Sequence, residues 1–198
     1  MQYNYLALGD SYTIGEQVPA EENFPNQTAA LLNEYITPPQ IIAVTGWTTD
    51  ELDAGINSEK LSGTYDIVSL LIGVNNQYRG RPVSNFKVEF EHLLQRAIQF
   101  ANNNPLHVFV LSIPDWGVTP FADGRDRNKI AAEIDAYNKV CETSAANFDT
   151  QYIDITASQR IDGSKDDFLA ADKLHPSGKE YAKWATKLAD AIKKEFGL

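Results

Sequence analysis

The chain is short of several residue types, and each shortage excludes a class of protein. A single cysteine, Cys141, among 198 residues rules out an internal disulfide bond. No apolar run approaches the ~20 residues that a helix needs to cross a bilayer, which argues against membrane insertion. Basic residues are also scarce: 17 Lys and Arg stand against 27 Asp and Glu, for a net charge of −10. Because phosphate groups would be repelled, we expect no binding to nucleic acid or to anionic lipid.

The remaining composition is that of an ordinary globular protein, with 43% hydrophobic and 22% charged residues. This length suits one domain, and we expect residues 1–198 to form a single one. Residues 1–5 do not have the form of a signal peptide, which favours a cytoplasmic location. The oligomeric state stays open, because the large helical aromatic residues are interpreted as core.

Short β-type segments alternate with longer helical patterns along the chain. Two of the segments, 67–72 and 108–111, are almost continuously apolar, as strands buried on both faces are. The predicted strands are 3–8, 41–45, 67–72, 107–112 and 151–155. The predicted helices are 24–35, 49–57, 82–103, 125–148 and one that begins at Pro176, with loops at 113–124 and 162–171.

This alternation predicts an α/β fold in which helices cover both faces of a parallel sheet. Because crossover connections are right-handed, few topologies remain. We predict a three-layer α/β/α sandwich of the flavodoxin-like type, with a central parallel sheet of about five strands.

Polar and glycine residues follow each predicted strand. In open parallel sheets, ligands bind beyond the carboxyl ends of the strands, so these residues are expected to gather at one edge. In strand order they are Asp10 and Ser11, Gly46 and Trp47, Gly73 with Asn75 and Asn76, Asp115 and Trp116, and Asp172 with His175. Their convergence is the main sequence argument for a functional site.

The residue types in this set suit nucleophilic catalysis. Ser11 can attack an ester carbonyl if His175 takes its proton, and Asp172 is close enough in sequence to orient the imidazole. The backbone N–H groups of Ser11 and Gly46 and the side-chain amide of Asn75 are candidate donors to the oxyanion.

Each of these residues also has an ordinary structural interpretation. A serine after a strand commonly caps a helix, a lone glycine commonly makes a turn, and two adjacent asparagines commonly do the same. An aspartate in a turn and a histidine before a proline are unremarkable by themselves. The catalytic interpretation depends on order, spacing and strand-end placement agreeing at every position.

Four further residues are candidates for substrate binding. Trp47, Trp116 and Phe121 follow strand ends, where they would line an acyl pocket or stack on a sugar; plain packing is the alternative. Arg79 is a candidate for an anionic group of the substrate, with a solvated loop or a surface ion pair as its alternative.

At this point the chain resembles a known family, the SGNH hydrolases, also called GDSL esterases and lipases. The matching motifs, in order, are Gly9-Asp10-Ser11, Gly46, Gly73-Val74-Asn75 and Asp172-x-x-His175-Pro176. The resemblance implies an α/β/α sandwich and a serine esterase that forms an acyl-enzyme without a metal. Two positions depart from the family pattern: Tyr12 replaces the leucine of the name motif, and Asn76 replaces the usual aspartate.

We therefore expect a serine esterase for small-molecule carboxylic esters with short acyl groups, O-acetylated carbohydrate being one candidate. No cofactor is expected, and with one cysteine and no His-Glu-x-x-His motif no dedicated metal site is expected. One alternative is a metal-dependent phosphoesterase with Asp10, Asn75, Asp172 and His175 as ligands. Another is a non-catalytic module that binds a sugar or an acyl group on the same fold.

Overall fold

The computed structural model describes residues 2–59, 61 and 63–198. Within these residues, five strands form one parallel sheet in the order β2-β1-β3-β4-β5. The strands are β1 (Tyr5–Gly9), β2 (Gln40–Ala43), β3 (Ile67–Leu71), β4 (Val108–Leu111) and β5 (Gln151–Ile153). The α-helices are α1 (Ser11–Ile14), α2 (Phe24–Leu31), α3 (Thr49–Ser58), α4 (Val74–Tyr78), α5 (Val83–Phe100), α6 (Arg127–Asn147), α7 (Thr156–Asp162) and α8 (Gly178–Phe196).

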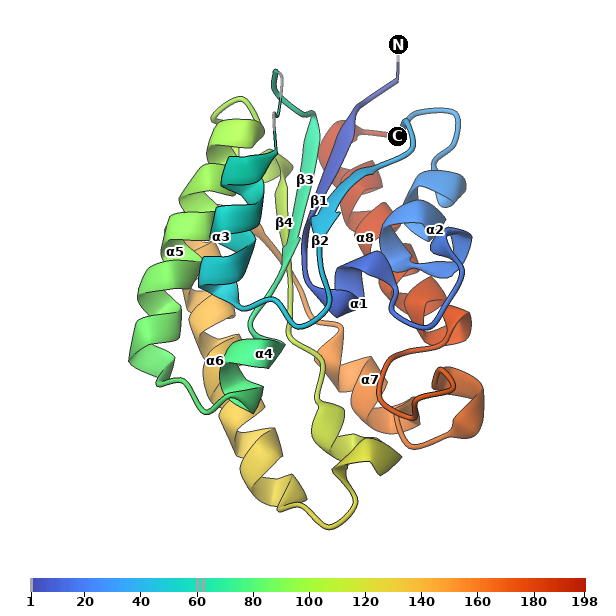
Figure 1. Cartoon of the computed structure of the whole chain (residues 1–198). Coiled ribbons are helices and arrows are strands. Elements are labelled where there is room, and N and C mark those ends of the chain that lie inside the picture. Colours follow the sequence, from blue (N-terminus) through green and yellow to red (C-terminus); the bar gives the residue numbers. More distant parts are fainter. Residues whose placement is uncertain (1, 60, 62) are drawn as a thin grey trace.

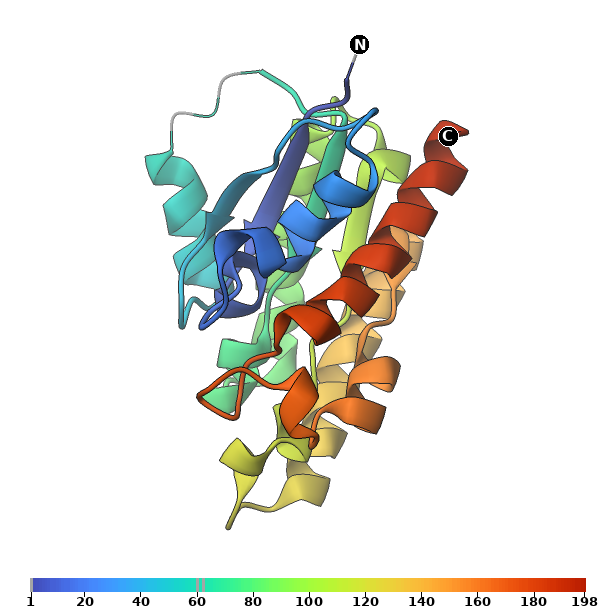
Figure 2. The same ribbon diagram turned by 90° about the vertical axis from the view of Figure 1, so that its right-hand side faces the viewer.

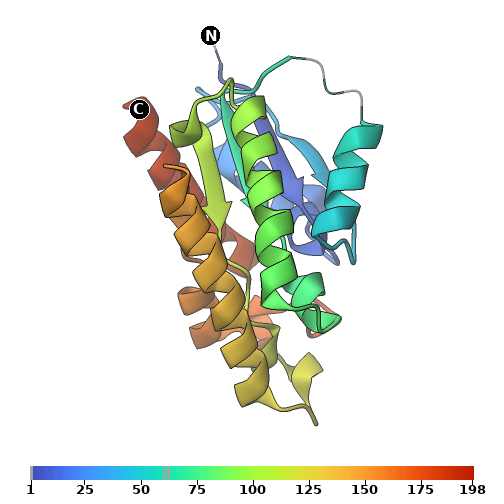
Figure 3. The same ribbon diagram turned by 90° about the vertical axis from the view of Figure 1, so that its left-hand side faces the viewer.

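The helices form a layer on each side of the sheet (Figure 1). Helices α2 and α8 pack against each other on one face, which Figure 2 turns toward the viewer. Helices α3, α5 and α6 cover the other face, in front in Figure 3. The strands run downward in Figure 1, and α1 and α4 begin at their lower, carboxyl ends. The predicted three-layer, flavodoxin-like fold is confirmed.

The three central strands, β1, β3 and β4, are buried along their whole length. Strands covered on both faces must be apolar throughout, which explains their near-continuous hydrophobic sequences. The one polar pair between β1 and β3, the Tyr5 hydroxyl and Ser69 Oγ, is hydrogen-bonded at 2.7 Å. Burial of these hydroxyls is therefore compensated by their mutual hydrogen bond.

The sequence predicted the long elements well and the short ones poorly. Every predicted strand is present, with ends that differ by at most two residues, and Cys141 is buried. Helices α1, α4 and α7 were not predicted, because four to seven residues are too few to show a helical period. The predicted loop at 113–124 contains two 3₁₀ turns, Trp116–Val118 and Pro120–Ala122.

The start of the last helix also differs from the prediction. Helix α8 begins at Gly178, with Ser177 at its N-cap, and not at Pro176. Pro176 instead forms an isolated antiparallel bridge with Leu169. A proline suits the first turn of a helix, but here the residues on both sides of Pro176 form the bridge: the Ala170 N–H donates to the His175 carbonyl at 2.8 Å and the Ser177 N–H to the Phe168 carbonyl at 3.0 Å.

None of the helices in the described ranges is both long and apolar enough to cross a membrane.

Gly9, the last residue of β1, provides a test of the fold around the first motif. A Cβ at this position would lie 2.0 Å from Thr13 Oγ1 and 2.5 Å from the Leu71 carbonyl oxygen. The backbone oxygen cannot move away without disturbing β3, so we expect Gly9→Ala to lower the free energy of unfolding by about 1–3 kcal/mol. Urea unfolding measures this change.

A matched control is Ala30→Ser, which adds one heavy atom at an exposed helical position. Its effect should stay within about 0.5 kcal/mol. Equal stability of Gly9→Ala and the parent chain would contradict close packing of Thr13 and Leu71 around Gly9.

Candidate active site

The strand order places the first and third motifs side by side. The chain runs from β1 outward to β2 and then returns to β3 on the other side of β1. Ligands bind at such a reversal of strand order, because the connections diverge and leave a crevice. Ser11 follows β1 and Asn75 follows β3, so both lie at this point, and Gly46 follows the neighbouring β2.

Ser11, His175 and Asp172 form a continuous chain of hydrogen bonds. His175 Nε2 lies 2.9 Å from Ser11 Oγ, and His175 Nδ1 lies 2.6 Å from Asp172 Oδ2. Ser11 and His175 are both largely buried, at 4% and 7% exposure. The structure thus brings together three side chains that the sequence separates by 164 residues, in the arrangement that serine hydrolases use.

The loop that carries Asp172 and His175 is held by its own backbone. Asp172 Oδ1 accepts hydrogen bonds from the N–H groups of Leu174 and His175, each at 3.0 Å. The Ala170 N–H donates to the His175 carbonyl at 2.8 Å, next to the Leu169–Pro176 bridge. These contacts fix the imidazole before α8 begins.

Electrostatics favour an ionised Asp172. Burial acts to raise the pKa of this carboxyl, but hydrogen bonds from the His175 ring and from the N–H groups of Leu174 and His175 outweigh it, so the pKa is lowered. An ionised carboxylate can only accept, and His175 Nδ1 must then carry the proton. Nε2 is left free to accept from the Ser11 hydroxyl.

Asp10 lies beside Ser11 but has the opposite electrostatic character. Its side chain caps α1 by accepting a hydrogen bond from the Tyr12 N–H at 3.0 Å, so Asp10 and not Ser11 is the capping residue. The side chain is fully buried, and this burial raises the pKa of Asp10 to about 7. The nearest side-chain amide, Asn75 Nδ2, is 3.4 Å from Asp10 Oδ2.

The candidate oxyanion donors gather around Ser11. Ser11 is the first residue of α1, and the N–H groups of a first helical turn have no partner within the helix. Gly46 has a positive φ of 85°, a conformation that glycine adopts without strain. Asn75 donates one amide hydrogen to the Trp47 carbonyl at 2.9 Å, which leaves the second for Asp10 or for a substrate.

An apolar cavity of about 200 Å³ opens beside Ser11 and His175. Gly46 and Asn75 also line it, with walls from Tyr12, Thr45, Val74, Tyr78, Trp116, Phe121 and Leu174. The Trp116 ring is anchored, because its indole N–H donates to Gln77 Oε1 at 2.7 Å. Outside the cavity, the Arg125 guanidinium lies 5.1–5.6 Å from the ring centroids of Tyr78, Trp116 and Phe121.

Two of the four candidate substrate-binding residues lie elsewhere. Trp116 and Phe121 line the cavity, whereas Trp47 and Arg79 do not. The Trp47 ring packs over Gly55 of α3, where a Cβ would be 2.1 Å from the indole. Arg79 donates to the Gly46 carbonyl at 2.7 Å and pairs with Glu51.

Several residues that shape this site were not predicted from the sequence. Val74 and Tyr78 were overlooked because α4 was not predicted, although they are four residues apart and line one wall. Glu51 had a recognisable signal: Thr48-Thr49-Asp50-Glu51 is a capping box, and the structure contains both of its hydrogen bonds.

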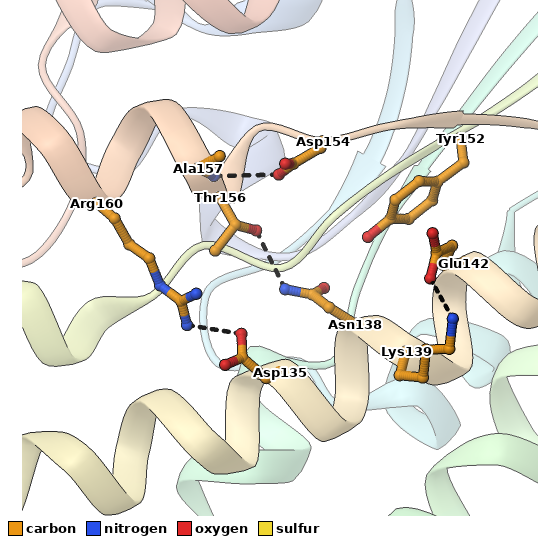
Figure 4. Close-up of a pocket in the computed structure, with 9 residues that line it drawn as sticks. All are labelled: Asp135, Asn138, Lys139, Glu142, Tyr152, Asp154, Thr156, Ala157 and Arg160. Atoms are coloured by element: carbon orange, nitrogen blue, oxygen red, sulfur yellow. Dashed lines mark hydrogen bonds and ion pairs between the residues drawn. The ribbon is translucent and has the colours of Figure 1, made fainter.

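A larger recess of about 420 Å³ is lined by α6, β5 and α7 and contains none of the residues discussed above (Figure 4). Four of its charged side chains form two ion pairs, Arg160 with Asp135 and Lys139 with Glu142. The remaining one, Asp154, accepts a hydrogen bond from the Ala157 N–H at 3.1 Å. Among the described residues, no three His, Cys, Asp or Glu side chains gather as a metal-binding group.

The sequence of residues 7–183 matches the GDSL-like lipase/acylhydrolase family. The chain belongs to this family. Members of the GDSL family hydrolyse carboxylic esters, and this chain is a carboxylic ester hydrolase. No curated protein gave a match.

Solved structures of GDSL-family and related esterases share the fold. A lipase/acylhydrolase from Enterococcus faecalis has a TM-score of 0.76 at 21% identity, covering 98% of this chain and 96% of that one. The esterase EstA from Pseudoalteromonas sp. has a TM-score of 0.72 at 18% identity, covering 100% of both chains. The acetylxylan esterase Axe2 from Geobacillus stearothermophilus has a TM-score of 0.73 at 18% identity, covering 99% and 94%.

The raised pKa of Asp10 predicts how the stability of this GDSL-family hydrolase depends on pH. Between the unfolded carboxyl's pKa of about 3.9 and the folded value of about 7, the folded chain holds a proton that the unfolded chain has lost. Asp10 therefore stabilises the fold least at high pH, and its contribution is lost as the pH rises from about 4 to 7. In Asp10→Asn, which keeps a capping side chain, the free energy of unfolding should fall less over this range, by a few kcal/mol at most.

Urea unfolding at each pH gives the free energy of unfolding, and its slope against pH is compared between Asp10→Asn and the parent chain. Asp190→Asn, at an exposed carboxyl, reports the effect of removing a charge alone. Parallel curves for Asp10→Asn and the parent chain would contradict the prediction.

Proposed function

We propose that the chain is a serine esterase that hydrolyses esters of short acyl groups through an acyl-enzyme. The observation that carries this proposal is the hydrogen-bond chain from Ser11 Oγ through His175 to Asp172, at 2.9 and 2.6 Å, beside an apolar cavity. A hydroxyl already bonded to a free imidazole nitrogen needs no rearrangement before its proton is removed.

In the proposed reaction, Ser11 Oγ attacks the ester carbonyl carbon while His175 Nε2 takes the hydroxyl proton. Asp172 stabilises the resulting imidazolium and keeps it oriented. When the tetrahedral intermediate collapses, the ester C–O bond breaks and His175 gives its proton to the departing alcohol. Water then attacks the acyl-enzyme with the same base, and the carboxylic acid leaves while Ser11 regains its proton.

The oxyanion of each tetrahedral intermediate would accept hydrogen bonds from three donors. These are the N–H groups of Ser11 and Gly46 and the amide of Asn75, whose second hydrogen meets only the long 3.4 Å contact to Asp10. A long contact is easily exchanged for a shorter bond to a developing negative charge.

The size of the cavity supports a short acyl group. Trp116, which Gln77 anchors, lines this cavity of about 200 Å³, and a volume of this size suits a short acyl group better than a long chain. Among the structural neighbours, one is described as an acetylxylan esterase and another as inhibited by monoethylphosphonate. O-acetyl groups on carbohydrate are accordingly our first candidate substrates.

The two alternatives lack comparable support. A metal-dependent phosphoesterase would need Asp10 and Asp172 to converge on one ion with His175, but both ring nitrogens of His175 are engaged by Ser11 and Asp172. A non-catalytic binding module would not need a serine bonded to an imidazole. Labelling of Ser11 by a fluorophosphonate probe tests this second alternative.

Substitution of either Ser11 or His175 should abolish ester hydrolysis. With p-nitrophenyl acetate, Ser11→Ala and His175→Ala should each lose roughly 10³-fold or more in kcat, because nucleophile and base act as one unit. Activity of the parent chain should also fall on the acid side, because a protonated imidazole cannot act as a base.

The matched control for the histidine is His92→Ala. His92 is exposed on α5 and contacts Asp53, so its removal should leave kcat unchanged. Full activity in both Ser11→Ala and His175→Ala would refute the assignment.

The aromatic walls should set the longest acyl chain accepted. Phe121 is 40% exposed, so Phe121→Ala should widen the cavity without unfolding the chain and shift the optimum in kcat/KM toward longer p-nitrophenyl esters. Trp116→Phe replaces a buried aromatic ring of the cavity wall with a smaller one. It should shift the optimum in kcat/KM further toward longer esters.

The control is Tyr35→Ala, which removes an exposed aromatic ring away from the cavity. It should leave the dependence of kcat/KM on acyl-chain length unchanged. An unchanged profile in both cavity variants would contradict acyl binding at this wall.

A further inference from the structure

Helix α4 determines the conformation of the loop that follows β2. Asn75 donates to the Trp47 carbonyl at 2.9 Å, and Asn76 Oδ1 accepts from the Thr49 N–H at 3.1 Å. Arg79, which directly follows the helix, donates through Nη2 to the Gly46 carbonyl at 2.7 Å. Asn75 and Arg79 are four residues apart and so lie on one face, from which they bind two consecutive carbonyls.

Gly46 depends on such external contacts more than other residues of the loop do. It has no side chain and a φ of 85°, so only hydrogen bonds restrain the adjoining peptide groups: the Trp47 N–H donates to the Val44 carbonyl at 3.2 Å, and Arg79 binds the Gly46 carbonyl. A Cβ built on Gly46 would have only Arg79 Nη2 within 4 Å, at 3.8 Å. The direction of the Gly46 N–H therefore depends on whether a hydrogen bond holds the Gly46 carbonyl.

The Arg79 side chain is itself held in place by the same loop. Its Nη1 donates to Glu51 Oε1 at 3.2 Å and to Oε2 at 3.1 Å. Glu51 Oε2 in turn accepts from the Thr48 N–H at 2.9 Å, as part of the capping box of α3. A planar guanidinium can satisfy the carbonyl and the carboxylate at once, in directions that a lysine ammonium cannot reproduce.

A contribution to stability does not explain the contacts of Arg79. The Arg79 and Glu51 side chains are 44% and 40% exposed, and ion pairs so exposed to solvent contribute little to the free energy of unfolding. The contacts instead hold the backbone of the loop after β2 in a single conformation.

We propose that Arg79 is a positioning residue that keeps the Gly46 N–H aimed at the oxyanion, and that it does not contact the substrate. This inference rests on the proposed function, in which Gly46 is an oxyanion donor. Misplacing a donor by about 1 Å can reduce a rate by about 10²-fold, so the loss of Arg79 should weaken transition-state stabilisation without removing substrate binding.

Steady-state kinetics with p-nitrophenyl acetate, together with the rate of inactivation by a fluorophosphonate, test the proposal. In Arg79→Ala we expect kcat to fall roughly 10- to 100-fold with KM changed less than about 3-fold, and inactivation to slow in parallel. Arg79→Lys should recover only part of the loss. Glu51→Gln should lower kcat by a smaller factor, because it loosens Arg79 without removing it.

The matched control is Arg81→Ala, which removes the same charge two residues away. Arg81 pairs with the side chains of Asp50 and Glu89, and not with the loop backbone. This variant should keep the parent kcat, and melting temperatures of the Arg79 and Arg81 variants should stay close to each other.

Three results would overturn the inference. They are an unchanged kcat in Arg79→Ala, an increase in KM with constant kcat, which would mean direct substrate contact, and an equal loss of kcat in Arg81→Ala. Failure of the proposed function has a different signature, because Ser11→Ala would then retain the activity of the parent chain.

Discussion

The reversal of strand order between β1 and β3 is the constraint from which the site follows. It places the ends of β2, β1 and β3 next to one another, and these ends carry Gly46, Ser11 and Asn75. The central strands are buried throughout, so the sheet hydrogen bonds define where each of these residues leaves the sheet. The groups proposed to surround one reacting carbon are thereby attached to the buried centre of the sheet.

His175, the proposed base, lies in a separate segment, which helix packing brings to the sheet edge. Helix α8 packs against α2, and its Trp184 ring lies 6.2 Å from Phe24 and 6.3 Å from Tyr12. The Tyr12 ring also lies 5.1 Å from the His175 imidazole. The departure from the family's leucine therefore puts an aromatic ring directly against the histidine, linking the serine motif to the segment that carries His175.

The pKa values of two carboxyls within this small region are shifted in opposite directions because their surroundings differ. Asp10 is fully buried and receives few hydrogen bonds, so its pKa rises. Asp172 receives hydrogen bonds from an imidazole and two backbone N–H groups, so its pKa falls. Only Asp172 is thus suited to stabilise a positive imidazolium, while Asp10 acts as a cap. Residue type alone could not have distinguished them.

The chemically informative residues could be predicted from the sequence because their signals are local. A buried strand is an apolar run, and Ser11, Asn75 and His175 stand where such runs or the chain's turns end. The three-layer fold followed from the alternation of strands and helices. Short helices such as α4 were missed because a single helical turn has no detectable period. Without α4, the contacts of Arg79 could not be predicted either.

Tertiary structure alone decided which side chains meet. The sequence by itself determined the parallel sheet, the edge at which the motifs gather and the residue types available there. It could not determine that Trp47 packs on Gly55, that Arg79 binds the Gly46 loop, or that Asp10 is the more deeply buried carboxyl. These outcomes depend on distances between segments far apart in the chain, and such distances are set only when the helices pack on the sheet.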